Sequence, residues 1–266
     1  MIEILLAIFF ITVLLLFLSS GIWVAISMIG VSSIGMILFT SRPVGDAMAT
    51  TIWGASSSWT LTALPLFVWM GEILFRTKLS ENLFEGLAPW LQKLPGGLIH
   101  VNVVGCALFA AISGSSAATV ATVGKMSIPE LRKRKYPEKI LLGSLAGSGT
   151  LGLLIPPSII LIIYGVTVQE SIAKLFIAGI IPGIMIALIF MGYVIIWSLL
   201  NKNKMPLTEE NYSFLNKLSK SKQLIPVILL ILGVIGSIYT GIATATEAAS
   251  LGVVGALILS YFQKSL

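Results

Sequence analysis

Stretches without a charged residue alternate with short charged segments along the whole chain. About 20 apolar residues are enough for a helix to cross a bilayer, so most of these stretches can hold a membrane span. The first is long enough for two spans, and Ser19, Ser20 and Gly21 supply a break between them. The pattern predicts an all-α polytopic membrane protein. The charge-free runs are residues 4–41, 47–71, 94–124, 140–169, 175–201, 223–246 and 248–263.

The run 94–124 is expected to enter the membrane and return to the same side. Both of its flanks are basic, with three basic residues in 76–93 and a basic loop at 125–139. A single crossing would place these flanks on opposite faces, against the positive-inside bias. A re-entrant hairpin keeps both inside, and Ile-Ser-Gly-Ser-Ser at 112–116 supplies a polar, flexible tip. Such backbone is tolerated at membrane depth only where it is buried in protein or lines a wet cavity.

The remaining runs follow by alternation. Run 140–169 leaves the basic loop and ends at a non-basic flank, so it is expected to cross outward, and 175–201 to return. With 224–240 outward and 245–262 back, the sequence predicts seven spans plus the hairpin, with the N-terminus outside and the C-terminal end inside. A cleaved signal peptide over 1–20 is the alternative, but the start lacks a positive n-region and its apolar stretch is long for an h-region.

Composition and charge support a membrane protein and exclude several other classes. Of the 266 residues, 56% are hydrophobic and 11% charged, whereas a soluble domain carries about 25% charge. This excludes a soluble globular enzyme, a disordered tail and a nucleic-acid binder. The net charge of +6 does not indicate a nucleic-acid partner, because 11 of the 17 basic residues lie in two short loops. These residues are Lys125, Arg132, Lys133, Arg134, Lys135 and Lys139 in one loop, and Lys202, Lys204, Lys217, Lys220 and Lys222 in the other.

Two less apolar segments separate the apolar runs. Residues 79–94 place apolar side chains on one helical stripe with Lys and Glu opposite, which is typical of an interfacial helix; an ordinary cytoplasmic connector is the alternative. Residues 201–222 are polar and lysine-rich and are interpreted as a linker between two repeats, or otherwise as a flexible surface loop. The stripe consists of Leu79, Leu83, Leu87, Trp90, Leu91 and Leu94.

The predicted organisation has six parts. They are three scaffold-like N-terminal spans at 1–75, an interfacial arm helix at 76–96, the re-entrant hairpin at 97–127, a cytoplasmic loop with a broken helix and a return span at 128–200, a cytoplasmic linker at 201–223, and two further spans at 224–266.

The tip of the hairpin is the first candidate site. It gathers hydroxyl side chains in an otherwise apolar run, and Gly114 permits a tight turn. A helix restarting at Ser115 or Ser116 would aim free N–H groups at an anion, while the carbonyls that end the preceding half-helix could coordinate a cation. The alternative is helix packing through small residues, which is common in membranes. The hydroxyl residues are Ser113, Ser115, Ser116, Thr119 and Thr122.

The second candidate site is a predicted helix break midway along the outward span 140–169. Pro156 and Pro157 remove two backbone donors and disfavour helical geometry before them. Together with Gly149, Thr150 and Gly152 they make a continuous helix improbable. The break frees carbonyl groups near Gly149, Gly152 and Ile155, and unwound carbonyls at the bilayer midplane can hold Na⁺ without a carboxylate. A proline kink without a ligand is the alternative.

The third candidate is the segment Thr244-Ala245-Thr246-Glu247. An intramembrane carboxylate is a functional hypothesis by default. Equally, Thr244 could start the last span, with Glu247 in its first turn at the outer interface. Both readings stay open. Elsewhere the chain has one cysteine and one histidine, so it offers no internal disulfide, no Cys- or His-cluster metal site and no catalytic constellation of an enzyme.

These motifs, in this order and spacing, resemble the large membrane subunit of TRAP transporters (tripartite ATP-independent periplasmic transporters). The resemblance covers essentially the whole chain, and the serine-rich tip together with the Gly-Pro-Pro break is its specific part. The matching stretches are LPLFVWMGEIL at 64–74, ISGSSAATVATVG at 112–124, GTLGLLIPPSI at 149–159 and GIATATEAA at 241–249.

The resemblance implies an inverted-repeat, elevator-type importer in a bacterial or archaeal cytoplasmic membrane, coupled to Na⁺ and needing no other cofactor. It implies a small membrane subunit and a periplasmic binding protein as partners, and an organic acid such as a C4-dicarboxylate or sialic acid as substrate. The residues implied to face the substrate are Ser113, Gly114, Ser115, Ser116 and Thr119. Those implied to hold Na⁺, mostly through carbonyls, are Ser113, Ser116, Gly149, Thr150, Gly152, Ile155 and Pro157.

A second, inverted repeat is expected to begin near Leu224, which starts inside whereas the N-terminus starts outside. Its own hairpin and Gly-Pro-Pro break would lie beyond Leu266, so we expect one complete repeat, an incomplete second repeat and a C-terminally truncated chain. Alternatives are another inverted-repeat ion-coupled carrier without a binding protein, or a non-transporting remnant that acts in assembly. A membrane enzyme is the weakest option.

Overall fold

The computed structural model describes residues 2–77, 79–206 and 212–262, and every regular element within these ranges is helical. The chain forms two compact units, residues 1–57 and 58–266, and each is described by itself. The first unit contains α1 (Ile2–Ser19), α2 (Val24–Phe39) and α3 (Val44–Ser56). The second contains η1 (Trp59–Thr62), α4 (Ala63–Arg76), α5 (Leu79–Leu91), α6 (Ile99–Ser113), α7 (Ser116–Lys133), α8 (Glu138–Gly149), η2 (Thr150–Leu153), α9 (Ile159–Val168), α10 (Ile172–Leu200), η3 (Lys202–Lys204), α11 (Phe214–Ser221), η4 (Lys222–Leu224), α12 (Ile225–Tyr239) and α13 (Ala245–Phe262).

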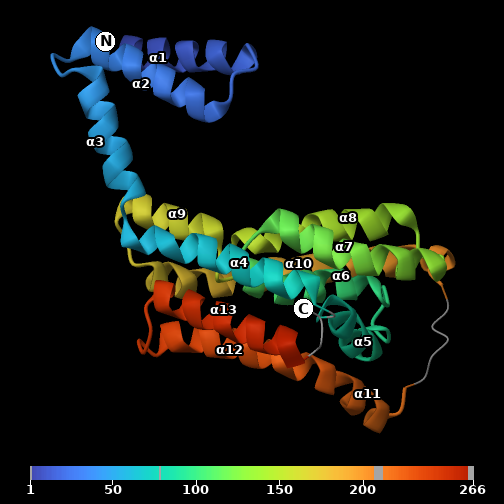
Figure 1. The fold of residues 1–266 in the computed structure, drawn as a ribbon. Helices are drawn as coiled ribbons and strands as arrows, with labels where there is room; N and C mark the ends of the chain where they lie inside the picture. Colours follow the sequence, from blue (N-terminus) through green and yellow to red (C-terminus); the bar gives the residue numbers. More distant parts are fainter. Residues whose placement is uncertain (1, 78, 207–211, 263–266) are drawn as a thin grey trace. The chain divides into compact units, whose positions relative to one another are not determined.

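In the first unit, α1 and α2 form a helical hairpin (Figure 1). The turn between them lies at the predicted break, where Gly21 has a φ of +79° that an L side chain rarely adopts. The two helices approach closely at Gly30, where an added Cβ would lie only 2.6 Å from the Phe17 ring. Their outer faces carry exposed apolar side chains, as expected of helices that face lipid.

The run 47–71 differs from a continuous span. It is divided between α3 and α4, and the boundary between the two compact units falls between Ser57 and Ser58. Ser58 is extended, with φ −65° and ψ 118°, so the helix stops there. Three consecutive serines at 56–58 offer the backbone alternative hydrogen bonds, which weakens a helix at this point.

Three helical segments among the described residues are long and apolar enough to cross a membrane: α10, the stretch Phe214–Tyr239 and α13. A fourth is present if α3 and the following helix Trp59–Arg76 count as one broken span. Helices α1, α2, α6 and α9 are apolar but shorter. Helix α10 exposes large apolar side chains along its length, for example Ile181 at 78% and Leu188 at 61%, which suits a lipid-facing surface.

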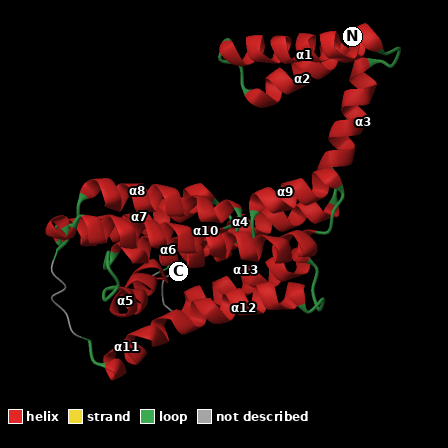
Figure 2. Ribbon diagram, turned by 180° about the vertical axis from the view of Figure 1, so that it is seen from behind, coloured by secondary structure: helices red, strands yellow, loops and turns green. Residues whose placement is uncertain are grey.

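The second unit is built around α6. Twelve of the 15 residues of α6 are buried, so this helix is packed on all sides rather than along one stripe. Figures 1 and 2 show α7 and α8 lying along one side of it and α4 along another, with α13 packed against α4. The core therefore surrounds the first arm of the hairpin.

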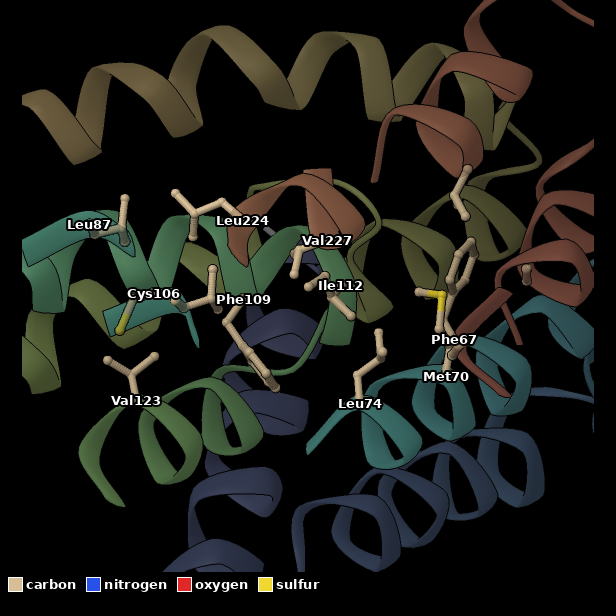
Figure 3. Close-up of a cluster of buried hydrophobic side chains, with 14 of the residues drawn as sticks. Phe67, Met70, Leu74, Leu87, Cys106, Phe109, Ile112, Val123, Leu224 and Val227 are labelled. Carbon is tan, nitrogen blue, oxygen red and sulfur yellow. The ribbon is translucent and has the colours of Figure 1, made fainter. Parts of the chain in front are cut away.

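Apolar side chains from several helices fill this core (Figure 3). Phe67, Met70 and Leu74 of α4 are each at most 2% exposed and belong to the same core cluster as Phe109 and Ile112 of α6. Burying each such side chain stabilises the fold by about 1.5–3 kcal/mol. Helix α4 is thereby fixed against both the hairpin and α13.

Candidate functional site

The tip of the hairpin is a turn between α6 and α7. Helix α6 ends at Ser113, and Gly114 follows in the left-handed region, with φ 59° and ψ 7°. Ser115 is extended and caps α7, because its Oγ accepts a hydrogen bond from the Ala118 N–H at 3.4 Å. Helix α7 begins at Ser116, so the predicted restart of the helix at Ser115 or Ser116 is confirmed.

The predicted break in the second candidate site is also present. Helix α8 ends at Gly149 and the chain continues as the 3-10 helix η2 to Leu153. It is then irregular until α9 begins at Ile159, and the Pro156–Pro157 peptide within this segment is cis. The Ser158 hydroxyl donates to the Leu153 carbonyl at 2.7 Å and closes the irregular segment over itself.

The tip and the break touch through their backbones. The Ile159 N–H donates a hydrogen bond to the Gly114 carbonyl at 3.3 Å, and a Cβ on Gly114 would collide with the Pro157 carbonyl oxygen. On the other side of the contact, a Cβ on Gly152 would lie 2.9 Å from the Ser116 nitrogen. Only glycine fits at Gly114 and Gly152, because the obstructing atoms are backbone and cannot rotate away.

Two further helices, α4 and α10, pack against this contact, and neither was among the candidates predicted from the sequence. In α4, a Cβ on Gly71 would lie 2.9 Å from the Ser113 Cα. In α10, a Cβ on Gly179 would lie 2.6 Å from the Leu154 carbonyl oxygen. Gly183, one turn further along α10, is equally close-packed against the Ile155 side chain. The Gly179–Gly183 spacing is the small-xxx-small pattern of membrane helix contacts and was the available signal.

Most hydroxyl groups of the tip are tied to neighbouring atoms. The Ser113 and Thr119 hydroxyls are hydrogen-bonded to each other at 3.0 Å, and Thr119 also donates to the Ser115 carbonyl at 2.8 Å. The Thr122 hydroxyl donates to the Ala118 carbonyl at 2.7 Å. These bonds brace the first turn of α7 and leave the three hydroxyls less free to bind a ligand.

Ser116 differs from the other tip hydroxyls. Its Oγ is buried and has no hydrogen-bond partner within the part of the chain that is described. Its backbone packs against Gly152. In the same broken segment as Gly152, the Ile155 and Pro157 carbonyl oxygens lie outside any helix, and no described residue donates a hydrogen bond to either. Buried polar atoms are nearly always paired, so such a group calls for a ligand, a water molecule or an ion.

The oxygen atoms at this contact fit a small hard cation better than an organic cofactor. They are neutral hydroxyl and carbonyl oxygens, the groups that hold Na⁺ where membrane helices unwind. No cluster of three or more His, Cys, Asp or Glu exists among the described residues, so a transition-metal centre has no ligand set there. Thr150, predicted beside this site, donates its hydroxyl to the Gly147 carbonyl at 2.7 Å and is exposed.

A buried polar seam holds the hairpin against the broken helix. Asn102 of α6 donates to the Leu141 carbonyl at 3.2 Å and to the Ser144 hydroxyl at 3.0 Å, both in α8. Ser148 of α8 donates to the Asn102 carbonyl at 3.4 Å. These bonds lie two to three turns from the tip and fix the spacing between the two elements that form it.

The third candidate segment starts a helix. Glu247 accepts hydrogen bonds from the Thr244 N–H and hydroxyl, both at 2.8 Å, and the Thr244 hydroxyl accepts one from the Glu247 N–H at 3.3 Å. This reciprocal arrangement is a capping box at the start of α13. Thr246 is buried, and its carbonyl accepts from the Ser250 hydroxyl. None of these bonds reaches the tip or the break, so the geometry favours the helix-start reading over a binding site.

Comparison with known proteins gives a consistent family. The family model described as "Tripartite ATP-independent periplasmic transporter, DctM component" matches residues 11–266. The chain is 34% identical to the C4-dicarboxylate TRAP transporter large permease protein of Pseudomonas aeruginosa, over 88% of this chain and 54% of that protein. It is also 34% identical to the sialic acid TRAP transporter large permease protein of Vibrio cholerae, over 90% of this chain and 55% of that protein.

The chain thus spans about half the length of these relatives, and the matched half contains both the hairpin tip and the helix break. The predicted resemblance is confirmed, and the relatives are multi-pass proteins of the inner membrane. The chain belongs to the DctM family, the large permease component of tripartite ATP-independent periplasmic transporters.

Proposed function

We propose that this chain supplies one cation-binding half of the transport machinery of a Na⁺-coupled TRAP importer. The observation that carries the proposal is the contact between the Ser113–Ser116 tip and the broken segment 149–159. The buried Ser116 hydroxyl on the tip has no hydrogen-bond partner among the described residues, and the Ile155 and Pro157 carbonyls of the break accept no hydrogen bond from a described residue. Neutral oxygens of this kind bind Na⁺ in other membrane carriers built with broken helices.

In this proposal the cation is held by Ser116 and the carbonyls of Gly152, Ile155 and Pro157. The other predicted ligands are Ser113, Gly149 and Thr150. The hydroxyls of Ser113 and Thr150 are already hydrogen-bonded, so these two residues and Gly149 would contribute carbonyl oxygens or positioning rather than free side chains. Since no described carboxylate hydrogen-bonds to the tip or the break, a bound Na⁺ would leave a net positive charge there.

That positive charge is the proposed origin of coupling. An acid group of the substrate would bind at the start of α7, where the Ser116 N–H donates to no described residue and the helix dipole favours an anion. The Gly114 N–H already donates to the Ala110 carbonyl and the Ser115 N–H to the Ser113 hydroxyl, so these two residues would shape the turn. A cation a few ångströms away would strengthen this binding, and the substrate would strengthen cation binding by the same factor. Ser113 and Thr119, the other residues predicted to face substrate, would brace the turn.

The proposed substrate is an organic acid. The two relatives described above are named for C4-dicarboxylates and for sialic acid, and further relatives are named for isethionate and for ectoine. We propose that a small membrane subunit and a periplasmic binding protein work with this chain, as the words "tripartite" and "large permease" indicate. The proposed transport step is an elevator-type movement of the hairpin and broken helix, without enzymatic chemistry.

Uptake by the reconstituted assembly tests the proposal. The full-length permease is placed in proteoliposomes with its small membrane subunit and its binding protein, and uptake of a radiolabelled dicarboxylate or sialic acid is followed with and without an inward Na⁺ gradient. We expect Ser116→Ala to raise the Na⁺ concentration needed for half-maximal uptake at least tenfold. The matched control is Ser237→Ala, whose hydroxyl only bonds the Val234 carbonyl in α12. Uptake that ignores the Na⁺ gradient would overturn the proposal.

A further inference from the structure

Helix α11 combines exposed apolar side chains with lysines. Phe214, Leu215 and Leu218 are 66%, 74% and 51% exposed, although the helix is only eight residues long. Lys217 and Lys220 lie on the same helix, and Lys222 follows directly in η4. At 100° per residue, the three apolar side chains share one stripe, with Lys217 beside its Phe214 edge and Lys222 in line with the stripe, one turn beyond Leu218. An apolar stripe flanked by lysines is the pattern of helices that lie in the membrane interface.

The other basic loop of the chain shows that lysine content alone does not create this pattern. The expected basic loop at 125–139 is largely helical, because α7 continues to Lys133 and α8 begins at Glu138. In this segment Arg132 pairs with Glu138 at 2.9 Å and Arg134 with Glu130 at 2.8 Å, so part of the positive charge is neutralised internally. No large apolar side chain from 125 to 139 is strongly exposed in the structure. By contrast, none of Lys217, Lys220 and Lys222 forms an ion pair with a described carboxylate.

Helix α11 is also held in place rather than free. The Trp90 indole N–H of α5 donates to the Ser221 hydroxyl at 2.7 Å, and its ring packs edge-on against Phe214 with centroids 6.3 Å apart. The Lys217 ammonium lies 5.4 Å from the Trp90 ring centroid. At the end of the segment, Leu224 packs against Gly86 of α5. We call this set of contacts, made by Trp90 and Gly86 of α5 with Phe214, Lys217, Ser221 and Leu224, the α5–α11 clasp. It orients the exposed stripe without covering it.

The position of the clasp along the chain places it next to a predicted membrane span. Helix α11 passes through η4 directly into α12, and Phe214–Tyr239 forms one helical segment that contains a stretch apolar and long enough to cross the membrane (Figures 1 and 2). The lysines therefore lie at the point where the chain enters the bilayer. Trp90, which is 44% exposed, is a residue type enriched at that depth.

We infer that the α5–α11 clasp is a binding surface for anionic phospholipids of the bilayer that α12 crosses. Leu215 and Leu218 would reach the acyl boundary, while Lys217, Lys220 and Lys222 contact the phosphates of acidic headgroups. Each lysine near such a surface favours binding roughly fivefold at low ionic strength, so the three together favour it by on the order of 100-fold. Two glutamates, Glu209 and Glu210, precede the helix in the sequence and would reduce this value.

Spin labels test the depth of the helix. Single cysteines are placed at Leu215 and at Asn216 in the whole chain, reconstituted in nanodiscs of phosphatidylcholine with 30% phosphatidylglycerol, and the accessibility of each nitroxide to oxygen and to an aqueous nickel reagent is measured. The unlabelled native Cys106 is buried, and the chain without added cysteine is the control. We expect oxygen access to dominate at Leu215 and nickel access at Asn216. Nickel access at both positions would overturn the inference.

Charge variants test the lipid class. Native mass spectrometry counts the phosphatidylglycerol and phosphatidylcholine molecules retained by the wild type, by K217Q/K220Q/K222Q and by the matched control K133Q/K135Q/K139Q in the other basic loop. We expect the first triple variant to lose at least tenfold in preference for phosphatidylglycerol and the control to keep it. Equal losses in both variants would refute a site at α11. Shielding of Leu215 only when a small permease subunit is added would mean that a protein, not lipid, covers the surface.

Discussion

Replacing Gly114 by alanine should separate the hairpin tip from the helix break. Gly114 has a φ of +59°, and an added Cβ would collide with the Pro157 carbonyl oxygen. The left-handed conformation costs about 1–2 kcal/mol for a non-glycine residue. The collision with backbone adds roughly 1–3 kcal/mol, the usual range for overpacking. We therefore expect Gly114→Ala to destabilise the fold by about 2–5 kcal/mol.

The chain offers a control that carries only the first of these two penalties. Gly241, in the turn before α13, has a φ of +72°, but nothing lies within 4 Å of an added Cβ. Gly241→Ala should therefore lose about 1–2 kcal/mol. The difference between the two variants isolates the contact with the break.

Thermal unfolding in detergent, followed by intrinsic fluorescence and by the fraction that stays monodisperse, measures both variants. We expect the unfolding temperature of Gly114→Ala to fall below that of Gly241→Ala by several degrees, since 1 kcal/mol corresponds to about 2–4 °C in a chain of this size. If the two variants unfold at the same temperature, the tip does not rest against the break and the reasoning about the site fails.

Three further predictions use the same assay. Gly179→Ala should destabilise by about 1–3 kcal/mol because its Cβ would press on the backbone of the break; an unchanged unfolding temperature would contradict this packing. Thr244→Ala and Glu247→Gln should each lose about 0.5–2 kcal/mol through the capping box, and the double variant less than the sum, whereas strict additivity would argue against a shared motif. Burial raises the pKa of Tyr136 and outweighs the hydrogen bond from the Leu98 N–H, which lowers it. The contribution of the neutral phenol to stability is therefore present below about pH 10 and is lost above it. Tyr136→Phe should be less stable than the wild type at neutral pH, but its unfolding temperature should fall less on alkaline titration.

The sequence revealed the turn and the break because their signals are local. Gly114 between serines, and Pro156-Pro157 after three glycines, restrict the backbone wherever they occur, so the end of α6 and the end of α8 follow from the residue types alone. Serine triplets are weaker signals, and the interruption at Ser57 and Ser58 was therefore not anticipated.

What the sequence could not supply is the assembly of the site in space. Gly71 and Gly179 were ordinary helical glycines in the sequence, and only the packing of α4 and α10 shows that they press on the tip and the break. Likewise, five hydroxyl residues were equivalent candidates at the tip. The geometry separates Ser116, whose hydroxyl has no partner among the described residues, from Ser113 and Thr119, which bond each other. Such distinctions depend on distances between segments far apart in the chain.

The measurement that tests the central claim most directly is the thermal unfolding of the wild type and of Ser116→Ala in NaCl, KCl and choline chloride. If Na⁺ binds between the tip and the break, NaCl alone stabilises the wild type, by about 2.7 kcal/mol at 100 times the dissociation constant, and the unfolding temperature keeps rising with the logarithm of the Na⁺ concentration. Without Na⁺, Ser116→Ala should be as stable as the wild type or more stable, because it removes a buried hydroxyl that lacks a partner. In NaCl it should become the less stable of the two. Equal stabilisation by all three salts, or an undiminished response to NaCl in Ser116→Ala, would contradict the account.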